Sequence, residues 1–131
     1  MPSTQVGAAI DSTVPLPHSQ VIDMTTTGRR TGQPRRIEIV LHNFGGRLYL
    51  SGTPNPDRTR AWLLNLARDP RLTVHLKGTS VVDLPATARI IVDEAERRAV
   101  VAHLVRVWRG QEIETMTAHS PLIEVTLVDR A

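Results

Sequence analysis

Residues 36–51 read RIEIVLHNFGGRLYLS, and this stretch decides the fold. Apolar and polar side chains alternate on either side of Gly45-Gly46, which is the pattern of two half-buried strands joined by a tight turn. The inward-facing positions of the two strands are Ile37, Ile39, Leu41, Leu48 and Leu50. The sequence therefore predicts a β-hairpin whose polar faces line one wall.

The segments around the hairpin predict an antiparallel α+β barrel of about six strands. Residues 21–26 are rich in β-branched side chains and form a strand, and a turn follows over 28–34. Further strands are expected around Leu72–Leu76, over 80–92 and around Ile123–Leu127. Because Pro85 cannot donate a ladder hydrogen bond, it predicts a bend or an edge position.

Two helices complete this arrangement. One is expected over residues 59–68, stopped by Asp69-Pro70, and the other begins with a capping-box pattern at Asp93 and ends at Gly110. Their predicted apolar faces consist of Leu63, Leu66 and Ala67 in the first helix and Val100, Leu104, Val107 and Trp108 in the second. Glu94, Glu96, Arg97 and Arg98 are expected to form a solvated face.

The composition favours one small intracellular domain. The chain has 131 residues and no cysteine, and we expect a single domain over 20–131 after a flexible arm over 1–19. It shows neither a signal-peptide pattern nor about 18 consecutive apolar residues, so the expected location is the cytoplasm, without a transmembrane segment. Peripheral membrane contact, and a monomer or a homodimer, stay open. The five histidines have no ligand spacing, so no metal site is expected.

An unusual concentration of arginine occupies the predicted turn. Residues 25–36 read TTTGRRTGQPRR, whereas Lys77 is the only lysine among the 16 cationic residues of the chain. Glycines bring backbone N–H groups close to an oxyanion, and guanidinium groups grip phosphate or carboxylate with paired hydrogen bonds. The loop is thus a candidate anion site, and the alternative is a solvated hairpin turn.

Two blocks of the sequence resemble the deazaflavin-dependent nitroreductase family. One is the loop TTGRRTGQPR at 26–35, and the other joins GRLYLS at 46–51 to WLLNLARDP at 62–70. The resemblance covers roughly residues 22–92. It implies an α+β fold, a mainly antiparallel six-stranded split β-barrel with two or three helices. It also implies coenzyme F420, a deazaflavin with a phosphodiester and an acidic oligoglutamate tail.

The resemblance also implies which residues bind the cofactor. The set is Arg29, Arg30, Thr31, Arg35, Ser51, Thr53, Arg58, Thr59, Arg60, Trp62 and Asn65. The loop residues would contact the phosphate or the tail carboxylates, the residues from Ser51 to Trp62 would border the ring and phosphate, and Asn65 would support the pocket. Tyr49 and Ser51 are the expected proton donors after hydride transfer, with Glu38 and His42 as alternatives.

The sequence departs from the family pattern in three places, one of which concerns the pocket for the acceptor. Gly52 replaces a lysine, Thr59-Arg60 replaces an Asn-Pro or His-Pro pair, and the C-terminal region has no tyrosine. We therefore expect an oxidoreductase that passes hydride from reduced F420 to a quinone, nitro or enone compound of undetermined structure. The alternatives are a flavin mononucleotide (FMN)-binding split-barrel reductase and a non-catalytic carrier of a fatty acid, another lipid or a cofactor. Few aromatic residues and a net charge of only +3 argue against nucleic-acid binding.

Overall fold

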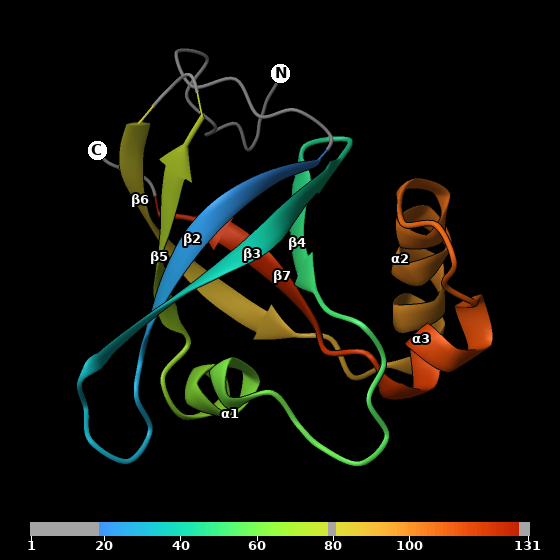
Figure 1. The fold of residues 1–131 in the computed structure, drawn as a ribbon, viewed down its shortest axis with the longest axis horizontal. Coiled ribbons are helices and arrows are strands. Elements are labelled where there is room, and N and C mark those ends of the chain that lie inside the picture. The colour runs from blue at the N-terminus through green and yellow to red at the C-terminus, as the bar shows by residue number, and fades with distance from the viewer. Residues whose placement is uncertain (1–18, 79–80, 129–131) are drawn as a thin grey trace.

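The predicted hairpin forms two adjacent strands of a closed antiparallel barrel, shown in Figure 1. The structure is a computed structural model that describes residues 19–78 and 81–128. Its elements are β2 (Ser19–Thr27), β3 (Pro34–Phe44), β4 (Arg47–Ser51), α1 (Ala61–Arg68), β5 (Arg71–Lys77), β6 (Val81–Ile90), α2 (Glu94–Val107), α3 (Ile113–His119) and β7 (Leu122–Leu127). The expected N-terminal arm lies outside the described residues except for Ser19, which opens β2.

The strands follow the order β2-β3-β4-β7-β6-β5, and β5 closes the barrel by pairing with β2. All six pairings are antiparallel, so the predicted six-stranded α+β barrel is confirmed. The register places Leu41 opposite Leu50, which puts the apolar positions of the hairpin on one face. That face is the inside of the barrel.

Apolar side chains from every strand fill the barrel. Its fully buried members include Ile22, Met24, Leu50, Val74 and Ile123. Helix α1 lies at one end of the barrel, as Figure 1 shows, and Leu66 inserts from it into the same cluster. Burial of a Leu or Ile side chain stabilises the fold by about 1.5 to 3 kcal/mol, so this end of the barrel is closed by packing.

A second apolar cluster lies outside the barrel, between the hairpin and helices α2 and α3. It contains Tyr49, Ile91, Val100, Val101, Leu104, Met116 and Leu122. His42 stacks with Phe44 and Trp108 at ring distances of 6.0 and 6.3 Å. The predicted polar wall of the hairpin was therefore wrong at His42 and Tyr49, which are only 4% and 6% exposed, because α2 covers that face.

The helices differ from prediction in their limits, and their number, three, agrees with the two or three that the family resemblance implies. Helix α1 begins at Ala61 instead of 59, and α2 ends at Val107, before Gly110. The predicted N-cap at Asp93 is confirmed, since its carboxylate accepts from the Glu96 N–H at 2.9 Å. The Glu96 carboxylate, which would complete a capping box, accepts from the Arg89 guanidinium instead. Helix α3 was not predicted from the sequence pattern, because its seven residues carry no sustained apolar period.

Two positions are less buried than predicted. Ala67 is exposed and Val107 is 49% exposed, because each lies at the edge of its helix's apolar face.

Pro85 lies within β6 and pairs with Thr73 of β5, so β6 is not an edge strand of the closed barrel. Pro85 still lies at a local edge, because the pairing of β6 with β7 begins only at Ala86. The Pro85 carbonyl accepts from Val128 N at 2.8 Å, just beyond the end of β7. Because the N–H and C=O of one strand residue point to the same side, the donor that proline lacks would also point towards β7. The ladder between β6 and β7 ends at this position, so its absence costs little.

Burial of His42 predicts an acid-sensitive fold. Removal from water lowers the pKa of His42 from 6.5 to about 4, because the charged ring is poorly solvated there. Between these two pH values His42 is protonated in the unfolded chain but not in the folded chain. The free energy of unfolding therefore falls as the pH drops from 6.5 towards 4. In His42→Phe, which has no imidazole to protonate, we expect the free energy of unfolding to fall by about 2 to 3 kcal/mol less over this pH range than in the wild type. Urea midpoints at several pH values measure the difference. Parallel curves for both proteins would refute this assignment.

Candidate functional site

The loop between β2 and β3 is folded by its own hydrogen bonds. Gly28 N donates to Gln33 O at 2.8 Å, and Gly32 N donates to Gly28 O at 2.8 Å. Gly32 has a φ of 72°, which favours glycine. A Cβ on Gly28 would lie 3.1 Å from both Gln33 O and Thr31 Oγ1. The arginines therefore project from a turn whose backbone path is fixed by glycine.

A buried asparagine joins this loop to helix α1. The side chain of Asn65 is 4% exposed, and its Oδ1 accepts from Arg29 N at 3.1 Å and Arg29 Nη1 at 3.5 Å. Its Nδ2 donates to Thr26 Oγ1 at 3.1 Å, at the end of β2. One amide thus satisfies the loop and the strand together, as a buried polar group requires.

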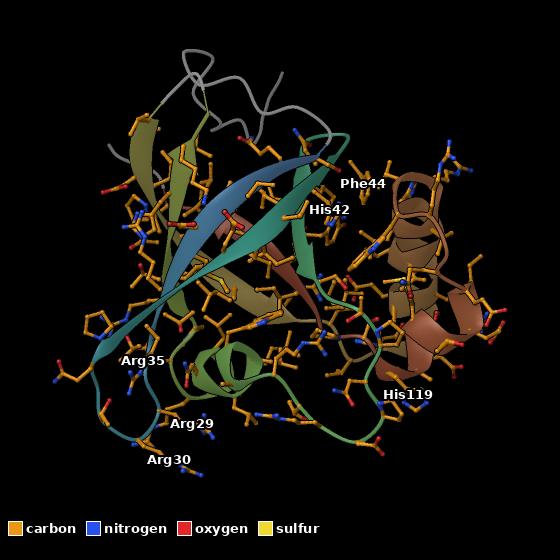
Figure 2. All side chains as sticks on the ribbon, in the orientation of Figure 1. Arg29, Arg30, Arg35, His42, Phe44 and His119 are labelled. Atoms are coloured by element: carbon orange, nitrogen blue, oxygen red, sulfur yellow. The ribbon has the colours of Figure 1, made fainter. Side chains whose placement is uncertain are left out.

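The loop and α1 enclose a pocket of about 370 Å³, which we call the arginine-loop pocket. It is lined by Thr26, Gly28, Arg29, Arg30, Thr31, Arg35, Ile37, Ala61, Trp62 and Asn65. Figure 2 shows Arg29 and Arg30 on the loop beside α1, with Arg35 close by at the start of β3. Trp62 also packs against the barrel core, so the pocket has one apolar wall and one cationic wall.

Among the residues that the structure describes, the arginines of this pocket have no acidic partner. Elsewhere in the described chain the arginines in ion pairs are Arg36, Arg47, Arg71, Arg89 and Arg98. None of the described carboxylates forms an ion pair with Arg29, Arg30 or Arg35, and no Asp or Glu lines the pocket. Such a donor set fits a phosphodiester and carboxylates, which guanidinium groups bind through paired hydrogen bonds.

The structure brings about half of the predicted site residues to this pocket. Those that line it are Arg29, Arg30, Thr31, Arg35, Trp62 and Asn65. Tyr49 lies instead in the outer core, where burial raises the pKa of its hydroxyl. Ser51 is buried and donates to Pro121 O at 2.6 Å. Neither of these expected proton donors lines the pocket.

The other predicted residues lie on the opposite side of the first turn of α1. Arg58, Thr59 and Arg60 line a second hollow, and Arg60 Nη2 donates to Thr53 O at 2.8 Å. Glu38 is exposed and pairs with Lys77, away from both hollows. The predicted cofactor residues therefore line two neighbouring hollows in the structure.

Sequence reasoning missed Arg97. It was assigned to a solvated face, but its half-buried guanidinium donates to Ile91 O, Thr117 O and Ser120 O at 2.9, 2.8 and 2.6 Å. The signal was present, because Arg97 lies three and four residues before Val100 and Val101 and therefore on the apolar face of α2. His119 ends the helix that the pattern did not reveal, Ser120 follows it directly, and both line the same hollow as Arg97.

The closed antiparallel barrel is a split barrel with a helix at one end, and the arginine-lined pocket lies beside that helix. Residues 4–128 match the family described as F420H(2)-dependent quinone reductase, and the chain belongs to that family. The resemblance seen in the sequence is confirmed. The chain is accordingly an F420-dependent oxidoreductase, and the family match selects F420 over FMN and the enzyme over the carrier.

Solved structures share the fold at low sequence identity. A conserved hypothetical protein from Mycobacterium tuberculosis has a TM-score of 0.65 and 18% identity, over 86% of this chain and 74% of that chain. An F420-H2 dependent reductase has a TM-score of 0.51 and 22% identity, over 80% and 92%. A putative 5-nitroimidazole antibiotic resistance protein from Bacteroides thetaiotaomicron has 0.60 and 14%, over 82% and 72%. In the described chain no helix is long and apolar enough to cross a membrane.

Removal of the Asn65 amide tests the link between the loop and α1. We expect Asn65→Ala to lower the free energy of unfolding by about 1 to 3 kcal/mol, because Arg29 N and Thr26 Oγ1 lose a buried partner. Arg68→Ala, an exposed change on the same helix, is the control and is expected to stay within about 0.5 kcal/mol of the wild type. Urea titration measures both. Equal midpoints for the two variants would show that Asn65 does not hold the loop.

Proposed function

We propose that the arginine-loop pocket binds the phosphodiester and acidic tail of F420, and that the chain reduces a small organic acceptor such as a quinone, a nitro compound or an enone. The observation that carries the proposal is the set of three arginines, each without a described carboxylate partner, around one pocket. Asn65 fixes the backbone of Arg29 at the pocket entrance. Uncompensated cations at a concave site attract an anionic ligand.

The chain's own residues act by binding and orientation. When bound, the reduced deazaflavin supplies a hydride from its ring carbon. The loop arginines and Thr31 hold the anionic part, and Trp62 offers an apolar surface beside it. Holding two reactants at near-attack distance removes much of the entropic barrier. The acceptor gains one hydride and one proton, so that a quinone leaves as a hydroquinone.

The proton in this proposal comes from solvent. Tyr49 and His42 are packed beneath α2, and the Ser51 hydroxyl is committed to Pro121 O. Burial raises the pKa of Tyr49 and lowers that of His42 to about 4, so neither group readily exchanges a proton near neutral pH. Because the oxygen of a reduced quinone is basic, it takes a proton from water without a dedicated side chain.

Two arginine variants test the cofactor site. We expect Arg30→Ala and Arg35→Ala each to weaken F420 binding by about 1.5 to 3 kcal/mol, the range for hydrogen bonds to charged groups. Quenching of F420 fluorescence measures the Kd directly. The loss is expected to shrink at high salt, because both side chains are exposed and their attraction is screened.

Arg36→Ala is the matched control, because Arg36 is the next residue along the chain and pairs with Asp23 at 3.0 Å instead of lining the pocket. We expect its F420 affinity to stay within about twofold of the wild type. Equal losses of F420 affinity in all three variants would show that only the net charge of the protein matters. Unchanged affinity in Arg30→Ala and Arg35→Ala would show that the loop is a solvated turn and not a cofactor site.

A further inference from the structure

A second pocket lies across the first turn of α1 from the arginine-loop pocket. It has a volume of about 450 Å³, and we call it the Arg97 pocket. Its polar lining comes from Arg58, Arg60, Arg97, His119 and Ser120, together with Asn55 and Thr59. No Asp or Glu lines it. Figure 2 shows His119 on the opposite side of α1 from the loop arginines. The helix therefore separates two cationic hollows.

The position of the Arg97 guanidinium is fixed by the fold. It makes three hydrogen bonds of 2.6 to 2.9 Å, all to backbone carbonyls at the ends of β6 and α3. None of the described carboxylates pairs with it. Carbonyl dipoles orient a guanidinium without cancelling its net charge, and its remaining N–H groups are still available to a ligand. The pocket wall therefore carries a held, uncompensated positive charge.

A buried hydroxyl beside Arg97 lacks a partner. Ser120 is 4% exposed and lines the pocket, and its Oγ has no hydrogen-bond partner among the described residues. A buried polar atom left unsatisfied is costly, and such atoms are uncommon in native proteins. An anionic oxygen in the pocket would accept from Ser120 Oγ. The unpartnered hydroxyl therefore indicates a ligand independently of the arginines.

The lining also has an apolar part, which includes Leu63, Ile90 and Pro121. Arg60 lies at the border, where its Nη2 is held by Thr53 and would come within 2.9 Å of any Cβ on Gly52. Glycine at this position therefore leaves room for the Arg60 guanidinium. An apolar surface beside a cationic rim fits a molecule with a hydrophobic ring and one acidic group.

We propose that the Arg97 pocket binds a carboxylate group of the acceptor, so that this enzyme reduces an acidic quinone or enone. The inference rests on the proposed function and adds the chemical class of the acceptor to it. The arginine-loop pocket supplies three arginines for the cofactor's own anions. The Arg97 pocket, on the other side of the same helical turn, supplies separate cations beside an apolar wall.

The test uses a naphthoquinone with a propanoic acid side chain and the methyl ester of the same compound. Binding to the protein without F420 is measured by titration calorimetry, and kcat/KM with reduced F420 is measured by cofactor oxidation. We expect the acid to bind at least about tenfold more tightly than the ester, the effect of one charge-assisted hydrogen bond. The acid is expected to have the higher kcat/KM by a similar factor.

Two variants assign that preference to the pocket. Arg58→Ala and Ser120→Ala are each expected to remove most of the preference for the acid, through a higher Kd and KM. The Kd of F420 is expected to stay unchanged in Ser120→Ala, which is the decisive variant because the family resemblance places Arg58, but not Ser120, among the cofactor residues. Ser120→Ala removes only an unpartnered hydroxyl, so the free protein is expected to unfold at the same or a higher temperature. Arg106→Ala, which removes an exposed arginine elsewhere on α2, is the control and is expected to keep the full preference.

The outcomes separate this inference from the proposed function. If the wild type binds acid and ester equally, the acidic acceptor is refuted. If Arg58→Ala and Ser120→Ala weaken F420 binding and leave the ratio of acid to ester unchanged, the pocket serves the cofactor and the inference also fails. If the wild type binds no F420, the proposed function fails, and calorimetry with the two quinones still decides whether the pocket takes a carboxylate.

Discussion

The site depends on one buried amide. Asn65 is the residue through which helix α1, the end of β2 and the arginine loop are joined by hydrogen bonds. A loop with three mutually repelling guanidinium groups would otherwise spread into solvent, because like charges in proximity raise the energy of a compact arrangement. The amide offsets that repulsion by holding the first arginine through its backbone. The side chains that follow are then free to meet a ligand.

The distribution of charge follows from which arginines the carboxylates reach. On the outer surface of the barrel Asp23 lies between Arg36 and Lys77, and Glu124 lies between Arg47 and Arg89. These exposed pairs contribute little to stability individually. These ion pairs neutralise cations on the outer surface of the sheet. The arginines without a described carboxylate partner therefore include those that line the two pockets beside α1. A modest net charge of +3 therefore conceals two strongly cationic hollows.

Helices α2 and α3 cover part of the outer surface of the barrel. Because both faces of the hairpin are buried around His42 and Tyr49, residues that alternate with the inner core do not reach solvent there. The same covering brings α3 against the end of β6, where Arg97 links the two through backbone carbonyls. The second pocket exists only because this packing leaves a gap beside α1.

The sequence by itself determined the barrel strands, the glycine turn of the arginine loop, the N-cap of α2 at Asp93 and the resemblance to the family. Each of these is encoded by neighbouring residues, through a period of two, a turn residue or a fixed spacing. Only the tertiary structure decided that Tyr49 and His42 are buried. It also decided that Arg58 and Arg60 line a different pocket from the loop arginines, and that Arg97 donates a hydrogen bond to Ser120 O. These outcomes depend on contacts between residues far apart in the chain, and a local pattern carries no information about which face a distant helix will cover.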